Sequence, residues 1–416
     1  MKSLRCLLNN HKNVCKGLAI AVIFDDGYFF VIFLHYEIEI LRGENRTMKV
    51  ALVHDWLTGM RGGEKILEVF CELFPDATIF ATIHNEGTMS PAIERMKIKT
   101  SFIQHLPLKA TKYRHYLPLM PAAIDELDFS EYDFILSTSV AVAKAAKPRS
   151  GAMHICYCNT PMRYIWDQYE EYFGKDRAGF ITRTIMSLIA PYLRRWDVRT
   201  CDRVHYFIAN SHNVAERISR IYHRMSNVIY PPVSTDLFTV SHKDEGYYLI
   251  VSALVPYKRV DLAIETFNRF GEKLLVVGSG PEMEKLKKMA KRNIEFLGWQ
   301  SDESLARLYT GCRALIFPGV EDFGIVPLEA MASGKPVVAF AKGGALETVV
   351  GDGDLPTGVF FHHQTVEALF EAMKALSKMK FDPYAIRRHA EKFDRKEFKR
   401  QISDYVTKQL PVSICT

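Results

Sequence analysis

The chain has 416 residues, which is too long for one ordinary domain and fits two or three. Hydrophobic residues make up 48% and charged residues 25%, so the composition excludes a disordered chain and predicts large hydrophobic cores. The net charge of +6 is the balance of 54 basic and 48 acidic residues, and this low charge density predicts no nucleic-acid partner.

Residues 1–47 are expected to form an N-terminal extension that neither folding nor activity requires. The apolar run Gly17–Leu34 has about the length of a bilayer span. However, Asp25 and Asp26 lie at its middle, where each carboxylate costs about 2.5–3.5 kcal/mol in a membrane helix. The alternative is a peripheral membrane anchor. Met48 opens an apolar run that we expect to be the first buried strand of the fold.

From residue 49 onward, short apolar runs alternate with amphipathic stretches, which predicts parallel sheets with helices on both faces. Strands are expected at 49–55, 77–83, 133–139, 153–158 and 204–211, and then at 247–254, 273–280, 294–299, 313–319, 335–341 and 358–361. Helices are expected at Val260–Phe270, Glu282–Arg292, Asp302–Tyr309 and Thr365–Ser377, with a terminal helix within Lys392–Gln409.

Two such halves predict an α/β protein with two Rossmann-like, doubly wound domains that face each other across a cleft. Pro231 and Pro232 interrupt regular structure and mark the join. We therefore expect an N-terminal domain at 48–229, a C-terminal domain at 230–391, and a terminal helix and tail at 392–416.

The most specific chemical pattern is a pair of glutamates, Glu321 and Glu329, on either side of a strand-to-helix junction. Gly324 allows close backbone approach, and the free amides of the following turn would point at an anion. Two carboxylates beside such amides could hold sugar hydroxyls while the amides hold a phosphate. The alternative is an ordinary capped helix with two solvated glutamates.

The motif E-x-F-G-I-x-P-x-E at 321–329, with A-x-x-x-G-x-P-V-V-A at 330–339 and G-G-x-x-E at 343–347, resembles the retaining glycosyltransferases of family 4. These enzymes have the GT-B fold. The segments Pro256–Arg259 and Tyr157–Tyr164 are most similar to the mannosyltransferase branch of polysaccharide and O-antigen assembly. The resemblance extends from Met48 to about residue 400.

The resemblance assigns Glu321 to the donor sugar and Glu329 to the nucleotide ribose. It implies that Lys258 neutralises the leaving diphosphate, a role that can replace a metal ion. The segment formed by Phe323, Gly324, Ile325 and Val326 would lie against the donor sugar and diphosphate.

The N-terminal domain is expected to complete the donor site. Gly62 and Gly63, placed between the first strand and the helix predicted at Lys65–Leu73, would bring backbone amides to a phosphate, although they could also form only a tight turn. Asn159 stands where relatives tend to show histidine, so it would keep hydrogen bonding to the transferred sugar but lose proton transfer.

A second departure from the family pattern is Ala253, where an arginine is usual five residues before the lysine. Arg259 or Arg163 could take over its contact with the donor, and the sequence leaves this choice open. Asp352 and Asp354 form a D-x-D pattern among glycines, and we interpret them as a turn. No metal or other cofactor is expected.

The eight cysteines include no C-x-x-C pair, and Cys156 and Cys158 are expected to be buried thiols on one strand face. We therefore expect a cytoplasmic protein, with peripheral contact to the cytoplasmic membrane face through the N-terminal domain left open.

The resemblance implies transfer of a hexose, with mannose from GDP-mannose favoured, onto a growing and plausibly lipid-linked saccharide. The alternatives are a UDP- or ADP-sugar donor, or a catalytically impaired protein that only binds nucleotide sugars.

Overall fold

The computed structural model describes residues 14–25, 28–39, 48–174 and 179–410, and the chain divides into a unit that ends at Thr47 and one that begins at Met48. In the first unit, β1 (Val14–Asp25) and β2 (Tyr28–Glu39) pair antiparallel, so the apolar run 17–34 is shared by two strands. Asp26 lies outside the described residues. No helix within these ranges is both long and apolar enough to cross a bilayer.

The N-terminal domain of the second unit contains a seven-stranded parallel sheet with the strand order β5-β4-β3-β6-β7-β8-β9. All the strands predicted in this half are present. The sequence did not predict β5 and β9, because these short edge strands lack an apolar run. The strands are β3 (Val50–His54), β4 (Thr78–Ala81), β5 (Lys97–Thr100), β6 (Phe134–Ser139), β7 (Met153–Cys158), β8 (Tyr206–Ala209) and β9 (Ser226–Val228).

The C-terminal domain contains a six-stranded parallel sheet with the strand order β12-β11-β10-β13-β14-β15, and each of its strands was predicted. The order reverses between β10 and β13, which is where open α/β sheets bind ligands. The strands are β10 (Tyr247–Val251), β11 (Lys273–Val277), β12 (Ile294–Gly298), β13 (Leu315–Phe317), β14 (Val337–Phe340) and β15 (Gly358–Phe361).

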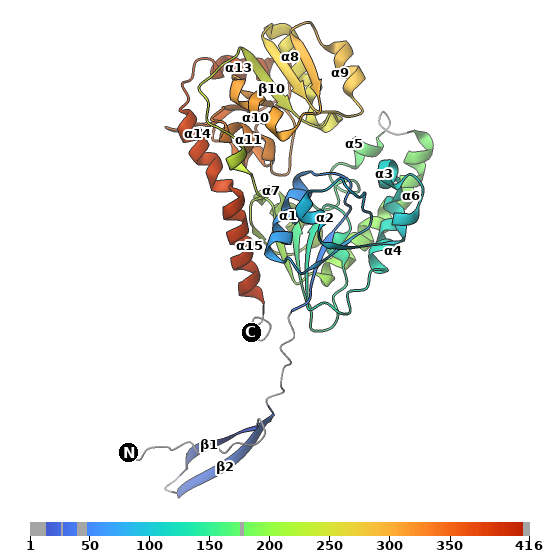
Figure 1. Ribbon diagram of the computed structural model, residues 1–416, viewed down its shortest axis with the longest axis vertical. Helices are drawn as coiled ribbons and strands as arrows, with labels where there is room; N and C mark the ends of the chain where they lie inside the picture. The colour runs from blue at the N-terminus through green and yellow to red at the C-terminus, as the bar shows by residue number, and fades with distance from the viewer. Residues whose placement is uncertain (1–13, 26–27, 40–47, 175–178, 411–416) are drawn as a thin grey trace. The chain divides into compact units, whose positions relative to one another are not determined.

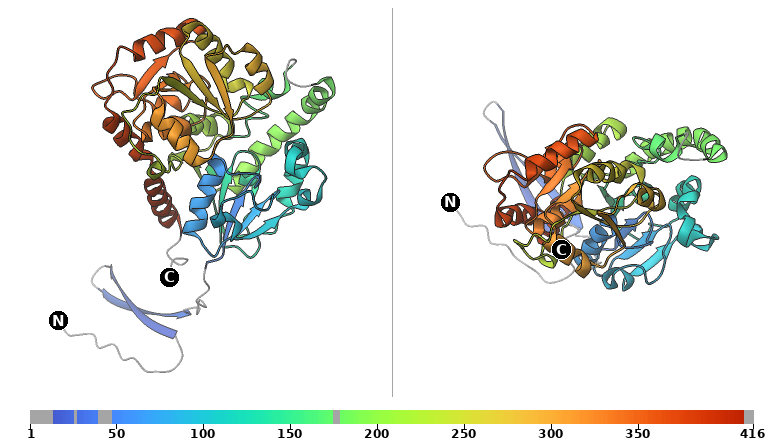
Figure 2. Two further views of the ribbon diagram at one scale, coloured as in Figure 1. Left: turned by 45° about the horizontal axis from the view of Figure 1, so that its top comes forward. Right: turned by 90° about the horizontal axis from the view of Figure 1, so that it is seen from above.

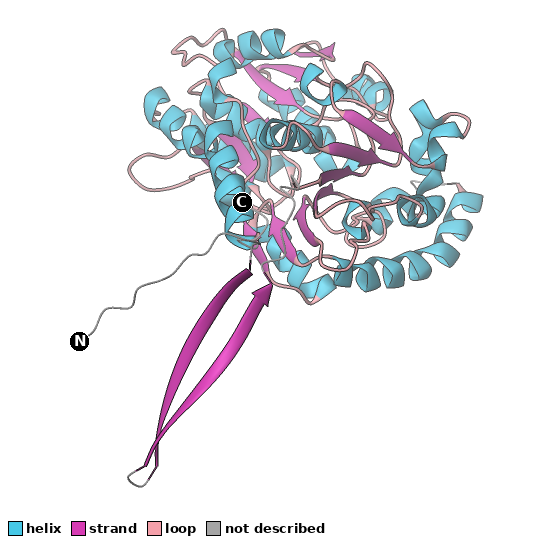
Figure 3. Cartoon of the chain, turned by 60° about the horizontal axis from the view of Figure 1, so that its bottom comes forward, coloured by secondary structure: helices cyan, strands magenta, loops and turns pink. Residues whose placement is uncertain are grey.

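Each sheet separates two hydrophobic cores, because successive side chains of a strand point to opposite faces. In β3, Ala51 and Val53 belong to one core, whereas Val50 and Leu52 belong to the other. In β10, Leu249 and Ile250 alternate in the same way. Helices cover both faces of each sheet, as Figures 1 and 3 show, and the prediction of two doubly wound α/β domains is confirmed.

The helices predicted beyond residue 229 are present, and α8 has the predicted bounds. The helix predicted at 282–292 is shorter, because its last hydrogen-bonded turn closes at Ala290. The helices of the N-terminal domain are α1 (Gly62–Leu73), α2 (Pro91–Glu94), α3 (Lys109–Lys112), α4 (Met120–Asp125), α5 (Tyr169–Phe173), α6 (Phe180–Arg199) and α7 (His212–Tyr222). Those that follow are α8 (Val260–Phe270), α9 (Met283–Met289), α10 (Asp302–Gly311), α11 (Ile325–Ala332), α12 (Ala345–Thr348), α13 (Val366–Leu376), α14 (Pro383–Ala390) and α15 (Arg395–Gln409).

The terminal helix α15 returns from the C-terminal domain and packs on the N-terminal one, where Figures 1 and 2 show it beside α1. The Phe398 ring lies 6.3 Å from that of Phe70 and 5.7 Å from that of Tyr157. Arg395 also forms an ion pair of 2.6 Å with Glu72 of α1. The last helix therefore completes the core of the first domain and holds the two domains together.

The prediction that Cys156 and Cys158 are buried thiols agrees with the structure. Cys156 and Cys158 are free thiols, and both are almost completely buried on β7. Burial raises the pKa of the Cys156 thiol to about 12, so it stays protonated at neutral pH.

Candidate active site

The predicted donor residues lie at the carboxyl end of β13, in the loop 318–324 that leads into α11. Gly324 is the residue before the helix and has φ +96°, a conformation that a side chain would strain. The first amides of α11 have no partner within the helix, so they can bind an anion. Binding of the donor phosphate by these amides stays a prediction.

Glycines hold this loop against two neighbouring segments. A Cβ atom on Gly344 would lie 2.2 Å from the backbone of Phe323, and one on Gly319 would lie 2.7 Å from the Cα of Lys258. The Gly344 amide also donates a 2.9 Å hydrogen bond to the carbonyl of Glu321. The glycines of G-G-x-x-E therefore allow the close approach that fixes the Glu321 backbone.

Lys258 and Glu321 form an ion pair. Lys258 ends a single 3₁₀ turn, η6 (Pro256–Lys258), that follows β10. Burial and then the guanidinium of Arg163 lower the pKa of Lys258 to about 7, although the Asp322 carboxylate acts in the opposite direction. The structure thus brings Lys258, Glu321 and Arg163 together, whereas the contacts of these residues with a donor stay predictions.

Asp322, which sequence reasoning did not single out, joins the two domains at this point. Its carboxylate accepts a 2.7 Å hydrogen bond from Arg163 and also pairs with Arg217 of α7. Its carbonyl accepts a 2.7 Å hydrogen bond from the hydroxyl of Ser211, the residue before α7. Although burial opposes it, the Asp322 carboxylate raises the pKa of Arg163. One buried carboxylate therefore holds two arginines of the other domain.

Glu329 lies on α11 and contacts both domains. Its Oε2 accepts a 3.0 Å hydrogen bond from the hydroxyl of Tyr309, and its Oε1 lies 3.4 Å from the Nζ of Lys65 on α1. Lys65 was not predicted as a site residue. The contact between Lys65 and Glu329 places the start of α1 opposite the proposed ribose position.

The Gly62–Gly63 pair lies inside the helix and not before it, because α1 begins at Gly62 and the expected start at Lys65 was too late. A Cβ atom on Gly62 would lie 3.3 Å from the Cδ1 of Ile325 on α11. A Cβ atom on Gly63 would lie 3.9 Å from the Nδ2 of Asn159. The two glycines therefore face both the anion-binding end of α11 and Asn159.

Asn159 follows β7 and is buried, and its amide donates a 3.0 Å hydrogen bond to the hydroxyl of Thr138. A histidine does lie nearby, since the ring of His54 would lie 3.3 Å from a Cβ on Gly63. The Nε2 of His54 is 3.5 Å from the Oε1 of Glu64. Sequence reasoning missed this pair, although Glu64 directly follows the Gly62–Gly63 motif.

Two predicted donor residues have other contacts. The ring of Phe323 packs in the core 5.3 Å from that of Tyr230, so only its backbone is free to meet a donor. Arg259 has φ +52° and forms an ion pair of 3.2 Å with Asp261. Neither arrangement tests the predicted donor contacts, which stay predictions.

Two carboxylate motifs have different surroundings. Asp352 and Asp354 are exposed and flank Gly353, whose φ of +83° is typical of the turn that was expected. Glu347, the last residue of G-G-x-x-E, accepts hydrogen bonds of 2.7 and 3.0 Å from the amides of His212 and Asn213. This carboxylate of one domain therefore caps α7 of the other.

Residues 236–397 match the family model described as "Glycosyl transferases group 1". The chain is 30% identical to the O-antigen chain mannosyltransferase RfbU of Salmonella typhimurium over 37% of this chain and 46% of that protein. It is 29% identical to the mouse alpha-1,3/1,6-mannosyltransferase ALG2 over 46% of this chain and 55% of that protein. The aligned regions thus span about half of these relatives.

Solved structures of glycosyltransferases share the fold. Anabaena HepE in complex with UDP has a TM-score of 0.63 at 18% identity, covering 87% of this chain and all of that one. The sucrose-phosphate synthase of Thermosynechococcus elongatus has a TM-score of 0.64 at 16% identity, covering 87% and 98% of the two chains. These likenesses confirm the GT-B architecture of two Rossmann-like domains.

Asp322→Ala should destabilise the protein, because it leaves Arg163 and Arg217 partly buried without their shared carboxylate. We expect the free energy of unfolding to fall by about 3 kcal/mol, as measured by chemical denaturation. Asp352→Ala is the matched control, since that carboxylate is exposed. Equal stability of the two variants would show that the arginines do not depend on Asp322.

Proposed function

We propose that this chain is a retaining glycosyltransferase of family 4 that moves a hexose, mannose from GDP-mannose, onto a growing saccharide. The observation that carries the proposal is the Lys258–Glu321 ion pair at the start of α11, with Glu329 on that same helix. The similarity to the mannosyltransferases RfbU and ALG2 supports mannose as the sugar.

In this proposal the donor lies across the start of α11. Its diphosphate binds the amides of Gly324, Ile325 and Val326 together with the ammonium of Lys258, because both favour negative charge. Glu321 holds hydroxyls of the sugar and Glu329 those of the ribose. Gly62 and Gly63 approach from the other domain, since Gly62 already lies against Ile325.

The transfer proceeds on one face of the sugar. The bond between the anomeric carbon and the diphosphate oxygen breaks while the acceptor oxygen forms its bond on the same side. The acceptor proton passes to the leaving diphosphate, so no enzymic nucleophile takes part. Lys258 stabilises the charge that develops on the leaving group, and the reaction therefore proceeds without a metal ion.

We further propose that the acceptor is lipid-linked and that the enzyme works at the cytoplasmic membrane face. The supporting feature is α6, which exposes an apolar stripe followed by Arg195 and Arg199 towards its end. Phe180 and Leu188 of this stripe are 78% and 75% exposed. An apolar helix face beside arginines is typical of helices that lie in a membrane interface.

The test is turnover by the purified full-length protein with a panel of GDP-, UDP- and ADP-sugars, in the presence of excess EDTA. We expect transfer from GDP-mannose to a mannose-containing acceptor, with the anomeric configuration of the donor kept in the product. Turnover of a UDP- or ADP-sugar alone would overturn the donor, and inversion would overturn the mechanism. Binding of nucleotide sugars without any turnover would favour the catalytically impaired alternative.

Donor binding should weaken as the pH rises through about 7. The pKa of Lys258 in the free protein is lowered to about 7, so its ammonium is present below this pH and is lost above it. One pH unit above the pKa about a tenth of the lysine is charged, so GDP-mannose should bind up to about tenfold more weakly at pH 8 than at pH 6. Calorimetry with the intact donor measures this change.

Lys258→Arg provides the control, because arginine stays charged over this range. This variant should bind the donor with little pH dependence. If donor binding by this variant depends on pH as strongly as that of the unchanged protein, a group other than Lys258 titrates.

Changing Glu321 to Gln and changing Glu329 to Gln should affect different kinetic constants. Glu321→Gln should mainly lower kcat, because contacts with the sugar tighten as its bond breaks. Glu329→Gln should mainly raise the donor KM, by roughly ten- to hundredfold, since a hydrogen bond to a charged group contributes about 1.5–3 kcal/mol. Steady-state kinetics with the donor varied measures both.

Glu284→Gln serves as the control for these kinetics, because its side chain is 80% exposed on α9. If both test variants fold and keep near-normal kinetics, the two carboxylates do not contact the donor.

A further inference from the structure

The proposed donor site places a diphosphate beside Lys258, and this lysine alone does not balance its charge. Both phosphates of a sugar nucleotide are negatively charged, and the leaving diphosphate gains further charge as its bond to the sugar breaks. Lys258 is paired with Glu321, and burial followed by the guanidinium of Arg163 lowers its pKa to about 7. At neutral pH this lysine is therefore charged in only part of the molecules. Binding of the diphosphate is favoured by a second cation from another residue.

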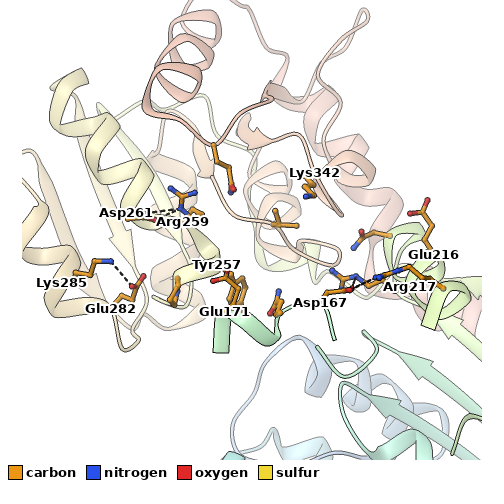
Figure 4. Close-up of a pocket in the computed structure, with 16 residues that line it drawn as sticks. Asp167, Glu171, Glu216, Arg217, Tyr257, Arg259, Asp261, Glu282, Lys285 and Lys342 are labelled. Atoms are coloured by element: carbon orange, nitrogen blue, oxygen red, sulfur yellow. Dashed lines mark hydrogen bonds and ion pairs between the residues drawn. The ribbon is translucent and has the colours of Figure 1, made fainter. Parts of the chain in front are cut away.

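The two arginines that the sequence offered as donor contacts already have carboxylate partners. Arg163 donates a 2.7 Å hydrogen bond to the buried carboxylate of Asp322. Arg259 lies 3.2 Å from Asp261, and Figure 4 shows this pair. Each arginine would have to give up its carboxylate before it could bind a phosphate.

Lys65 of α1 is a cation whose partner can be taken over by the donor itself. Its Nζ lies 3.4 Å from the Oε1 of Glu329, which is longer than either arginine contact. The Lys65 side chain is 32% exposed, so solvent screens and weakens this pair. In the proposed function the ribose hydroxyls bind Glu329, and they can replace the lysine at this carboxylate.

Glu329 keeps hydrogen-bond partners when the lysine leaves. Its Oε2 accepts a 3.0 Å hydrogen bond from the hydroxyl of Tyr309. Burial and then the Glu329 carboxylate raise the pKa of Tyr309, so this hydroxyl keeps its proton and donates. The ribose hydroxyls can donate to Oε1. Exchange of the lysine for the ribose therefore leaves no oxygen of this carboxylate without a partner.

The ammonium of Lys65 is within reach of the place assigned to the diphosphate. Glu329 lies one turn after Ile325 on the same face of α11, and one helical turn rises about 5.4 Å. Gly62, on the same helix as Lys65, already approaches Ile325, because its Cβ would lie 3.3 Å from the Cδ1 of that residue. Lysine has a long flexible stem, so rotation of the side chain can move the ammonium from Glu329 towards the first amides of α11.

We propose that Lys65 binds the donor diphosphate across the boundary between the domains, and that Glu329 holds its ammonium until the ribose arrives. The ligand class is a nucleoside diphosphate, recognised by one lysine from each domain. The proposal rests on the proposed function, which assigns the ribose to Glu329 and the diphosphate to the start of α11.

The test compares nucleotide binding by the full-length protein with that by Lys65→Met, which removes the ammonium and keeps a long side chain. Calorimetry at constant ionic strength measures GDP and guanosine, with UDP and uridine in parallel. We expect Lys65→Met to bind the preferred nucleoside diphosphate about tenfold or more weakly, because a charge-assisted contact is lost. Binding of the matching nucleoside, which has no phosphate, should stay within about twofold. Lys65→Arg should keep most of the diphosphate affinity, since it keeps the charge.

Two further variants separate a phosphate contact from other effects of losing a lysine. Lys399→Met is the matched control, because this lysine is 42% exposed and lies 3.1 Å from Glu72, at the far end of α1. It should bind GDP as the unchanged protein does. Arg259→Met tests the rival cation and should weaken the diphosphate less than Lys65→Met. Lys65→Met should also keep its thermal stability, since a partly exposed ion pair stabilises a protein little.

The proposal falls if the unchanged protein binds neither nucleoside diphosphate, or if Lys65→Met binds them equally well. It also falls if Lys65→Met weakens nucleoside and diphosphate alike, or if only Arg259→Met weakens the diphosphate. Its failure is distinguishable from failure of the proposed function. A diphosphate affinity that depends on Lys65, without transfer of any sugar, would keep the contact and remove the transferase. Sugar transfer with a donor KM that Lys65→Met leaves unchanged would keep the transferase and remove the contact.

Discussion

The carboxylate of Asp322 lies between Arg163 and Arg217, and the arrangement of the site depends on these contacts. Three consecutive residues of this loop face three environments. Glu321 pairs with Lys258, Asp322 holds the arginines of the other domain, and Phe323 packs in the core of its own domain. The alternation leaves the loop little freedom, because a shift of one residue would bury the wrong group in each place. The glutamate proposed to hold the donor sugar is therefore positioned by its neighbours on either side.

Further contacts join the domains around this loop. Glu347 caps α7, Lys65 reaches Glu329, and α15 packs its Phe398 side chain on the first domain. The Lys65–Glu329 contact joins two elements that each carry a proposed binding motif. The start of α1 supplies both the glycines and Lys65, and α11 supplies both the anion-binding amides and Glu329. A donor that enters between these helices must contact both domains, which would couple nucleotide binding to the geometry of the acceptor side.

The sequence predicted the elements that depend on local patterns. Apolar runs marked the buried strands because a parallel strand buries both faces, and the spacing of Glu321 and Glu329 marked the strand-to-helix junction. The edge strands β5 and β9 were not predicted, because they contain no such apolar run. The pairing of Arg217 with Asp322 and that of Lys65 with Glu329 could not be predicted, since the partners lie 105 and 264 positions apart. Only the fold brings these side chains together, and no spacing in the sequence encodes the pairing.

A crystal structure of the full-length protein with intact GDP-mannose would test the assignment of the donor site. We expect the diphosphate at the amides of residues 324–326 and at Lys258, the ribose hydroxyls on Glu329, and the mannose hydroxyls on Glu321. A nucleotide that binds without touching α11 would contradict this assignment.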